Sequence, residues 1–274
     1  MDLLNFCRAH GILIDSMPPI GIWKRFPTED HPRSRNGAVK FMGDHAFVQN
    51  HALDVEVAVW KIDATHVVDH QRIQRDVREA ERQRQELQRA AIAKTAKILS
   101  EAQFGKHDYL KAKGFPDAEG KVWVKDGEQF LVIPMRVGGN LVGCQMIDQS
   151  GGKKFLYGQR TSGAELVIDN KGVDIFCEGY ATALSIQSVL RKLKRRYRIH
   201  VCFSAMNLKK IALAIGSGCV VADNDKSGTG ERIAKEIGYP YWMSEVLGED
   251  ANDTMQRVGD FRFGQAIIKS LKVV

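Results

Sequence analysis

The sequence lacks the patterns typical of secreted, membrane-spanning or zinc-binding chains. It contains five cysteines in 274 residues, and none of them forms a Cys-x-x-Cys pair. Cysteines scattered in apolar segments predict reduced, buried thiols instead of disulfides or a zinc site. There is no run of about 18 apolar residues, and the N-terminal residues lack the basic and then apolar order of a signal peptide. We therefore expect a cytoplasmic protein without a membrane partner.

The histidines do not replace the absent cysteine pairs as metal ligands. The candidates are His31, His45, His51 and His66. Their spacing matches no zinc-ligand pattern, and no cysteine supports them. No zinc is therefore expected as a cofactor.

Acidic residues are fewer than basic ones. Lys and Arg number 40, against 33 for Asp and Glu, and the formal net charge is +7. A positive net charge favours a polyanionic partner, although it carries no information about the fold. Nucleic acid is therefore the leading partner class.

Changes in composition divide the chain into four predicted parts. These are a small β-rich N-terminal module (1–64), a long charged helix that acts as a linker (65–105), a basic α+β subdomain (106–168) and a C-terminal α/β domain (169–274). Short alternating runs between Trp23 and Trp60 predict an antiparallel meander in the first part. The stretch from Thr65 to Phe104 contains no Gly or Pro and is rich in Arg, Gln, Glu and Ala, a composition that favours helix.

The first two parts each allow a nucleic-acid role and a structural one. Basic residues at the start of the meander either face nucleic acid or are solvated loop charges. These residues are His31, Arg33, Arg35 and Lys40. The first half of the helix is either a solvated spacer between domains or a basic surface on a nucleic-acid backbone, and its interspersed acids favour the spacer.

Two apolar runs in the predicted C-terminal domain end in acidic residues, and each is followed by a segment with a helical pattern. VDIFCEG carries Glu178, and VVADNDKSGTG carries Asp223 and Asp225. Apolar runs that alternate with helical segments predict a largely parallel sheet covered by helices, with ligands at the carboxyl ends of its strands. Three carboxylates at one edge would repel one another without a divalent cation. The sequence therefore predicts a magnesium site at these acids, with manganese as the alternative ion.

A basic and aromatic loop precedes the acidic strands. It contains Lys153, Lys154, Tyr157 and Arg160, interleaved with Phe155 and glycines. Cations in such a loop contact phosphates, and the rings pack or stack on bases. The alternative is a basic surface hairpin.

Further candidates follow the second acidic strand. Lys226 and the backbone amides of the turn before the next helix can receive a phosphate. Asp250 and Asp253, in GEDANDTM, stand near the start of another helix. For these two aspartates, a helix cap and a metal ligand are alternative roles.

Together these motifs resemble the Toprim domain shared by DnaG-type primases, topoisomerases and some nucleases. The resemblance covers about Val173 to Val258 and combines EG after one strand, DxD after a second and the later DANDTM. Two preceding segments are similar to the basic subdomain before Toprim in bacterial and phage primases. They are IPMRVGGNLVGCQMID, which contains Arg136, and GGKKFLYGQ. The resemblance implies a Toprim-like parallel sheet flanked by helices.

Among primases, the chain is most similar to small stand-alone phage or plasmid enzymes. The resemblance implies a nucleotidyltransferase that makes short RNA primers on single-stranded DNA from ribonucleoside triphosphates with magnesium. The family's metal residues correspond to Glu178, Asp223 and Asp225, with Asp250 and Asp253 as further candidates. A separate replicative helicase is an implied partner, and a bacterial host cytoplasm is the implied location if a phage encodes the chain.

The chain departs from this family at its N-terminal end. Such primases usually begin with a zinc ribbon that helps to choose the initiation site, and the cysteines for one are absent. The meander would be a metal-free replacement or a remnant. A Toprim nuclease and a non-catalytic single-strand-binding replication adaptor are the alternative functions.

Overall fold

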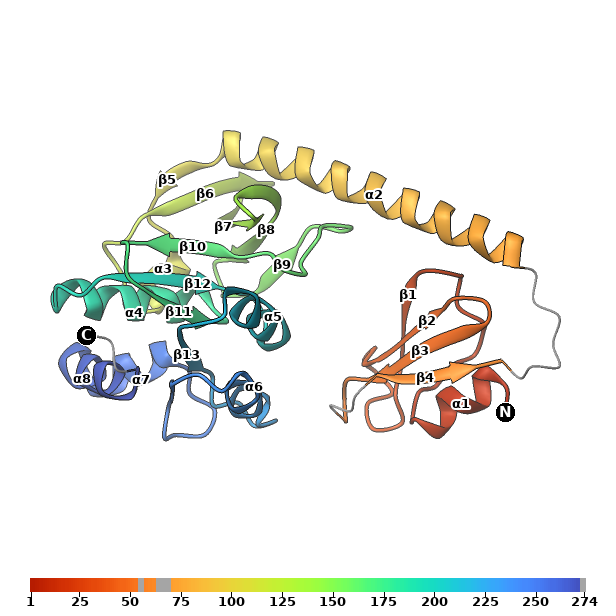
Figure 1. The fold of residues 1–274 in the computed structure, drawn as a ribbon. Coiled ribbons are helices and arrows are strands. Elements are labelled where there is room, and N and C mark those ends of the chain that lie inside the picture. Colours follow the sequence, from red (N-terminus) through yellow and green to blue (C-terminus); the bar gives the residue numbers. More distant parts are fainter. Residues whose placement is uncertain (54–56, 63–69, 272–274) are drawn as a thin grey trace. The chain divides into compact units, whose positions relative to one another are not determined.

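The computed structural model describes residues 1–53, 57–62 and 70–271. These residues form a mixed α/β fold with eight helices and three sheets (Figure 1). The chain divides into two compact units, Met1–Leu87 and Gln88–Val274. The mixed α/β class is confirmed at this level, and the division into four parts stays a prediction. None of the described helices is both long and apolar enough to cross a bilayer.

The first unit contains a four-stranded antiparallel sheet and a short helix. Its elements are α1 (Leu3–Ala9), β1 (Trp23–Phe26), β2 (Gly37–Phe41), β3 (His45–Asn50) and β4 (Ala58–Lys61). Residues of β3 alternate between buried and half-buried, as expected for a sheet with one covered face. The predicted meander is confirmed for β2, β3 and the described part of its last strand, β4, and β1 extends it by one unpredicted strand.

Several predicted features of this region fall on residues outside the description. They are the end of the turn at Asp54, the start of the strand at Val55, the module boundary at 64 and the helix start near Thr65. The same holds for His66, one of the histidines considered as metal ligands. The described part of the long helix is α2 (His70–Glu101), and it continues into the second unit.

The second unit begins with the last part of α2, which covers an antiparallel sheet. The sheet contains β5 (Gln103–Gly105), β6 (Gly120–Lys125), β7 (Glu128–Val137), β8 (Asn140–Asp148) and β9 (Lys153–Phe155), paired in that order. Ala91 and Ile98 of α2 are buried with Val132 and Cys144. On the other face, Leu131 and Ile147 pack with α3 (Asp108–Ala112). One face of this part of α2 is therefore structural, whereas its opposite face carries exposed charges such as Lys97 and Glu101.

The last sheet is mainly parallel and has the order β10-β12-β11-β13-β14. Its strands are β10 (Leu166–Asp169), β11 (Val173–Cys177), β12 (Tyr197–Val201), β13 (Cys219–Ala222) and β14 (Tyr241–Met243). The apolar runs fold in this way because their residues are buried on both faces of the sheet. The exception to the parallel pattern is β10, an edge strand that pairs antiparallel with β12 and was not predicted.

Five helices cover the two faces of this sheet (Figure 1). They are α4 (Tyr180–Lys192), α5 (Ala205–Ile215), α6 (Thr229–Ile237), α7 (Ala251–Val258) and α8 (Asp260–Leu271). Ile175 and Cys177 of β11 are buried in the cluster that contains α4, α7 and α8 residues. Phe176, between them, is buried among residues of α5 and α6. The alternation of β11 thus places its carboxyl end between two helical layers.

Candidate metal and nucleotide site

Glu178 and Asp223 leave adjacent parallel strands at the same edge of the sheet. Cys177, the last residue of β11, is paired with Val221 of β13, so Glu178 and Asp223 follow this pair within one and two residues at the same edge. Both carboxylates line one cleft of about 560 Å³. The charged residues around this cleft are Lys113, Lys153, Glu178, Asp223, Asp250 and Asp253.

The two carboxylates hold protons more tightly than isolated ones do. Burial raises the pKa of Glu178 to about 7, and the charges of Asp223 and Asp225 add to this effect. Burial also raises the pKa of Asp223 to about 6, with a further contribution from Asp250. The Oδ1 atom of Asp223 is buried and accepts no hydrogen bond. A buried carboxylate oxygen without a partner is costly, and a cation at this position would relieve the cost.

Asp225 does not line the cleft and faces its own loop instead. Its carboxylate accepts hydrogen bonds from Ser227 N at 2.7 Å and from Gly230 N at 3.2 Å. Burial works in the opposite direction, but the hydrogen bonds from Ser227 and Gly230 lower the pKa of Asp225. The strand β13 ends at Ala222, so the alternation of an extended segment does not continue through the two aspartates. The DxD spacing therefore does not place both carboxylates on one side.

Two carboxylates of the cleft are suitable ligands for a divalent cation. Within the described residues, no group of three or more His, Cys, Asp or Glu side chains is arranged to hold a metal ion. Glu178 and Asp223 nevertheless supply hard oxygen donors, which magnesium and manganese prefer, and one of these oxygens has no partner.

No protein-family model, curated protein or solved structure matches the chain. The chemistry of the cleft is therefore inferred from its own residues.

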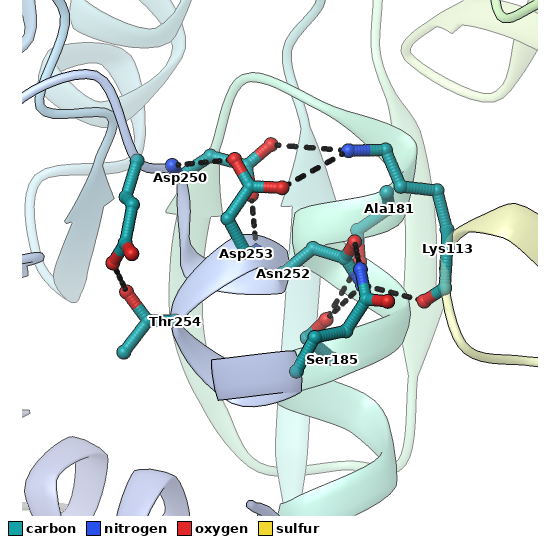
Figure 2. A network of polar contacts seen from close by, with 9 residues as sticks. Lys113, Ala181, Ser185, Asp250, Asn252, Asp253 and Thr254 are labelled. Atoms are coloured by element: carbon teal, nitrogen blue, oxygen red, sulfur yellow. Dashed lines mark hydrogen bonds and ion pairs between the residues drawn. The ribbon is translucent and has the colours of Figure 1, made fainter. Parts of the chain in front are cut away.

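Asp250 and Asp253 form a capping box at the start of α7 (Figure 2). Asp250 Oδ1 accepts from Asp253 N at 2.9 Å, and Asp253 Oδ2 accepts from Asp250 N at 3.2 Å. Their carboxylates also form ion pairs with Lys113 Nζ, at 4.0 Å for Asp250 and 3.4 Å for Asp253. The helix-cap role is thus present in the structure, and the metal role stays a prediction for both residues.

A buried amide connects the capped helix to its neighbours. Asn252 Nδ2 donates to the carbonyl oxygen of Lys113 at 2.8 Å and to Ser185 Oγ at 3.0 Å. Ser185 Oγ in turn donates to the carbonyl of Ala181 in α4 (Figure 2). Lys113 is therefore fixed through its backbone and through its ammonium group. Its role has no local sequence signal, because its partners are about 140 residues further along the chain.

The predicted cations occupy different places. Lys153 lines the cleft, whereas Lys154 points away and lies over the ring of Phe130 at 5.5 Å. Alternation along β9 explains this difference between neighbouring residues. Arg160 Nε donates to Ser162 O at 3.0 Å, and Arg136 Nη1 donates to Gly139 O at 2.9 Å. The remaining candidates, Tyr157 and Lys226, are exposed and do not line the cleft.

Two further residues of the cleft were not predicted. Gln145 of β8 is buried and lines the wall, and Phe203 lies just after the carboxyl end of β12. The rule that ligands bind beyond the ends of parallel strands would have pointed to Phe203. Gln145 is in an antiparallel strand of another sheet, and only the packing of the two sheets brings it to the cleft.

Proposed function

We propose that the chain is a Toprim-type DNA primase that makes short RNA primers on single-stranded DNA by magnesium-dependent nucleotidyl transfer. The observation that supports this function best is the pair of Glu178 and Asp223 at adjacent parallel strand ends. Burial raises the pKa of both groups, neighbouring carboxylates add to the effect, and a simple binder of polyanions does not need buried acids at this edge. The surrounding sheet order and the EG, DxD and DANDTM motifs support the assignment to Toprim.

Glu178 and Asp223 are the residues that would hold magnesium. When bound, the ion would lower the pKa of the primer 3′ hydroxyl and neutralise charge on the transferred phosphoryl group. Lys153 lines the same cleft and would bind the triphosphate. Asp225 would act mainly as a positioning residue, because it accepts the N–H groups of the loop that follows Asp223.

The exposed cations and ring outside the cleft would contact the nucleic-acid strand. These residues are Arg136, Lys154, Tyr157, Arg160 and Lys226. The four-stranded sheet of the first unit would replace the zinc ribbon of related primases without a metal. A separate helicase is the proposed protein partner, and the cytoplasm of a bacterial host is the proposed location.

The test is incorporation of labelled ribonucleotides on single-stranded DNA, with magnesium and with chelator. Asp223→Asn is expected to reduce magnesium-dependent synthesis by about 100-fold or more, because a catalytic metal supplies several kcal/mol. Asp126→Asn is the matched control, since Asp126 is an exposed turn residue away from the cleft. Undiminished synthesis by Asp223→Asn would show that the assigned site is wrong.

The same reactions separate the alternatives when cleavage of the DNA and binding to it are measured beside incorporation. A Toprim nuclease would cleave the DNA with magnesium in the absence of ribonucleotides. A non-catalytic adaptor would bind DNA equally well with chelator and would incorporate nothing. Either result from the wild-type chain would overturn the primase proposal.

A further inference from the structure

A second pocket lies beside the carboxylate cleft and shares a wall with it. It has a volume of about 460 Å³, within the usual range for small-molecule sites of roughly 300–1,000 Å³. Its lining includes Phe155, Ser162, Phe203, Met206, Asn207 and Lys210. Phe203 also lines the carboxylate cleft, and its N–H donates to the carbonyl oxygen of Glu178 at 2.9 Å. The two pockets are therefore adjacent at the proposed metal ligand.

Exposed apolar side chains form the walls of this second pocket. The rings of Phe155 and Phe203 are nearly perpendicular, at 85°, with centroids 6.4 Å apart. Phe155 is 43 % exposed on the short edge strand β9, and Met206 is 58 % exposed in the first turn of α5. Neither side chain contributes much to a core at this exposure. Phe155 therefore provides an exposed ring and Met206 a polarisable thioether for a flat apolar ligand, whereas Phe203 is half-buried against the core.

The backbone of Phe203 is held in an unfavourable conformation. Its φ angle is 68°, in the left-handed region that a phenylalanine rarely adopts. The bonds from Cys202 N to Cys177 O and from Phe203 N to Glu178 O keep this segment beside β11. Such strained residues persist where the surrounding structure holds them, and they cluster at ligand sites.

The polar groups of the pocket are already fixed by one another. Asn207 accepts from Gly163 N at 2.6 Å and donates to Ala164 O at 2.8 Å and Cys202 O at 2.7 Å. Its amide is thereby saturated and fixes the loop that forms one side. Lys210 Nζ donates to Ser162 Oγ at 2.7 Å, which holds a positive charge at the rim. A ligand would therefore be recognised by stacking and charge more than by hydrogen bonds to its edge.

We propose that this pocket binds a nucleobase, stacked on the exposed ring of Phe155 beside Phe203, whose attached phosphates lie towards the carboxylate cleft. Lys153 and Phe155 are two residues apart on β9 and share one face of that strand. Lys153 lines the cleft and Phe155 lines the second pocket, so one strand faces both the phosphates and the base. The inference rests on the proposed nucleotidyl transfer. The base belongs either to the incoming ribonucleotide or to the template strand, and all four bases are expected to bind because every base has a stacking face.

The test is equilibrium binding to the full chain with magnesium, measured by calorimetry. The probes are ATP, inorganic tripolyphosphate, an oligo(dT) strand and an abasic oligonucleotide of the same length. Phe155→Ala and Phe155→Leu are expected to weaken binding of the base-containing ligand by about 10-fold, and Phe155→Trp to retain it. Phe261→Ala is the matched control, because Phe261 is an exposed phenylalanine on α8, outside both pockets.

The ligand pattern distinguishes the two sources of the base. Weaker ATP binding with unchanged tripolyphosphate binding identifies the incoming nucleotide. Weaker oligo(dT) binding with unchanged binding of the abasic strand identifies the template. Equal weakening of base-containing and base-free ligands, no effect of Phe155→Ala, or no binding of ATP and oligo(dT) by the wild-type chain would overturn the inference.

Primer synthesis is measured in parallel so that the two proposals can fail separately. Phe155-dependent base binding without any synthesis would overturn the primase function and keep the base pocket. Synthesis and ligand binding that do not depend on Phe155 would keep the primase function and overturn the base pocket. Thermal unfolding of each variant confirms that the exposed substitution leaves the fold intact.

Discussion

The carboxylate of Asp223 lies close enough to Glu178 to raise the pKa of that side chain. Burial is the larger cause, and together the effects bring the pKa of Glu178 to about 7. The two groups are near one another because the strands that precede them are paired in parallel and end within one residue of the same level. This relationship makes the cleft unfavourable for two ionised carboxylates unless a cation is bound.

Replacing Asp223 by Asn is therefore expected to stabilise the protein in the presence of chelator. The substitution removes a charge that burial and the neighbouring acids disfavour, and it keeps the shape of the side chain. From the raised pKa of about 6, we expect a gain of about 1–3 kcal/mol in the free energy of unfolding at pH 8. Denaturant unfolding with chelator measures it.

Magnesium should offset this advantage of Asp223→Asn. The wild-type chain is expected to gain about 2.7 kcal/mol at a magnesium concentration 100 times its dissociation constant, whereas Asp223→Asn should gain much less. A variant less stable than the wild type in chelator would contradict the proposed strain between the carboxylates.

A second prediction concerns His200, which is buried between two carboxylates. Its Nδ1 lies 2.6 Å from Glu165 and its Nε2 lies 2.9 Å from Asp174. Burial alone would lower the pKa of His200, but the hydrogen bonds to Glu165 and Asp174 outweigh it and raise the pKa above the ordinary 6.5. The charged imidazole should therefore stabilise the fold fully below pH 6.5, and the contribution should disappear as the pH rises through the raised pKa.

The measurement compares the wild type with His200→Gln by urea unfolding from pH 5.5 to 9. The difference in unfolding free energy should be largest at low pH and should shrink as the pH rises. A pH-independent difference would show that His200 acts only through packing, for example through its stacking on Phe176 at 4.8 Å.

A third prediction tests the loop that positions Asp223. A Cβ atom at Gly230 would lie 2.1 Å from the carbonyl oxygen of Asp223, so the backbone would have to move. Gly230→Ala is expected to lower the free energy of unfolding by about 1–3 kcal/mol and to weaken magnesium binding. Gly105→Ala is the control, because its added Cβ would meet its nearest neighbour only at 4.0 Å. Unchanged stability and magnesium affinity in Gly230→Ala would contradict the close approach.

Much of the last sheet was predictable because its signals are local. The apolar runs before Glu178 and Asp223 alternate with helical segments, and this order specifies parallel strands with loops at one edge. Strand β10 was missed, although its four residues are apolar at three positions, because it is an antiparallel edge strand outside that alternation. The contacts of Ala91 and Ile98 in α2 with Val132 and Cys144 were also not predicted, because no local pattern links the helix to the strands that cover it.

The sequence by itself determined the alternation of strands and helices after Val173 and the place of Glu178 and Asp223 after apolar strands, because backbone pattern and chain connectivity are local properties. Tertiary structure decided which side chains share the cleft. Asp225 turns to the N–H groups of its own loop, and Lys113 reaches Asp253 across about 140 residues of chain. Such choices depend on competition between hydrogen-bond partners and on packing between sheets, which spacing along the chain does not encode.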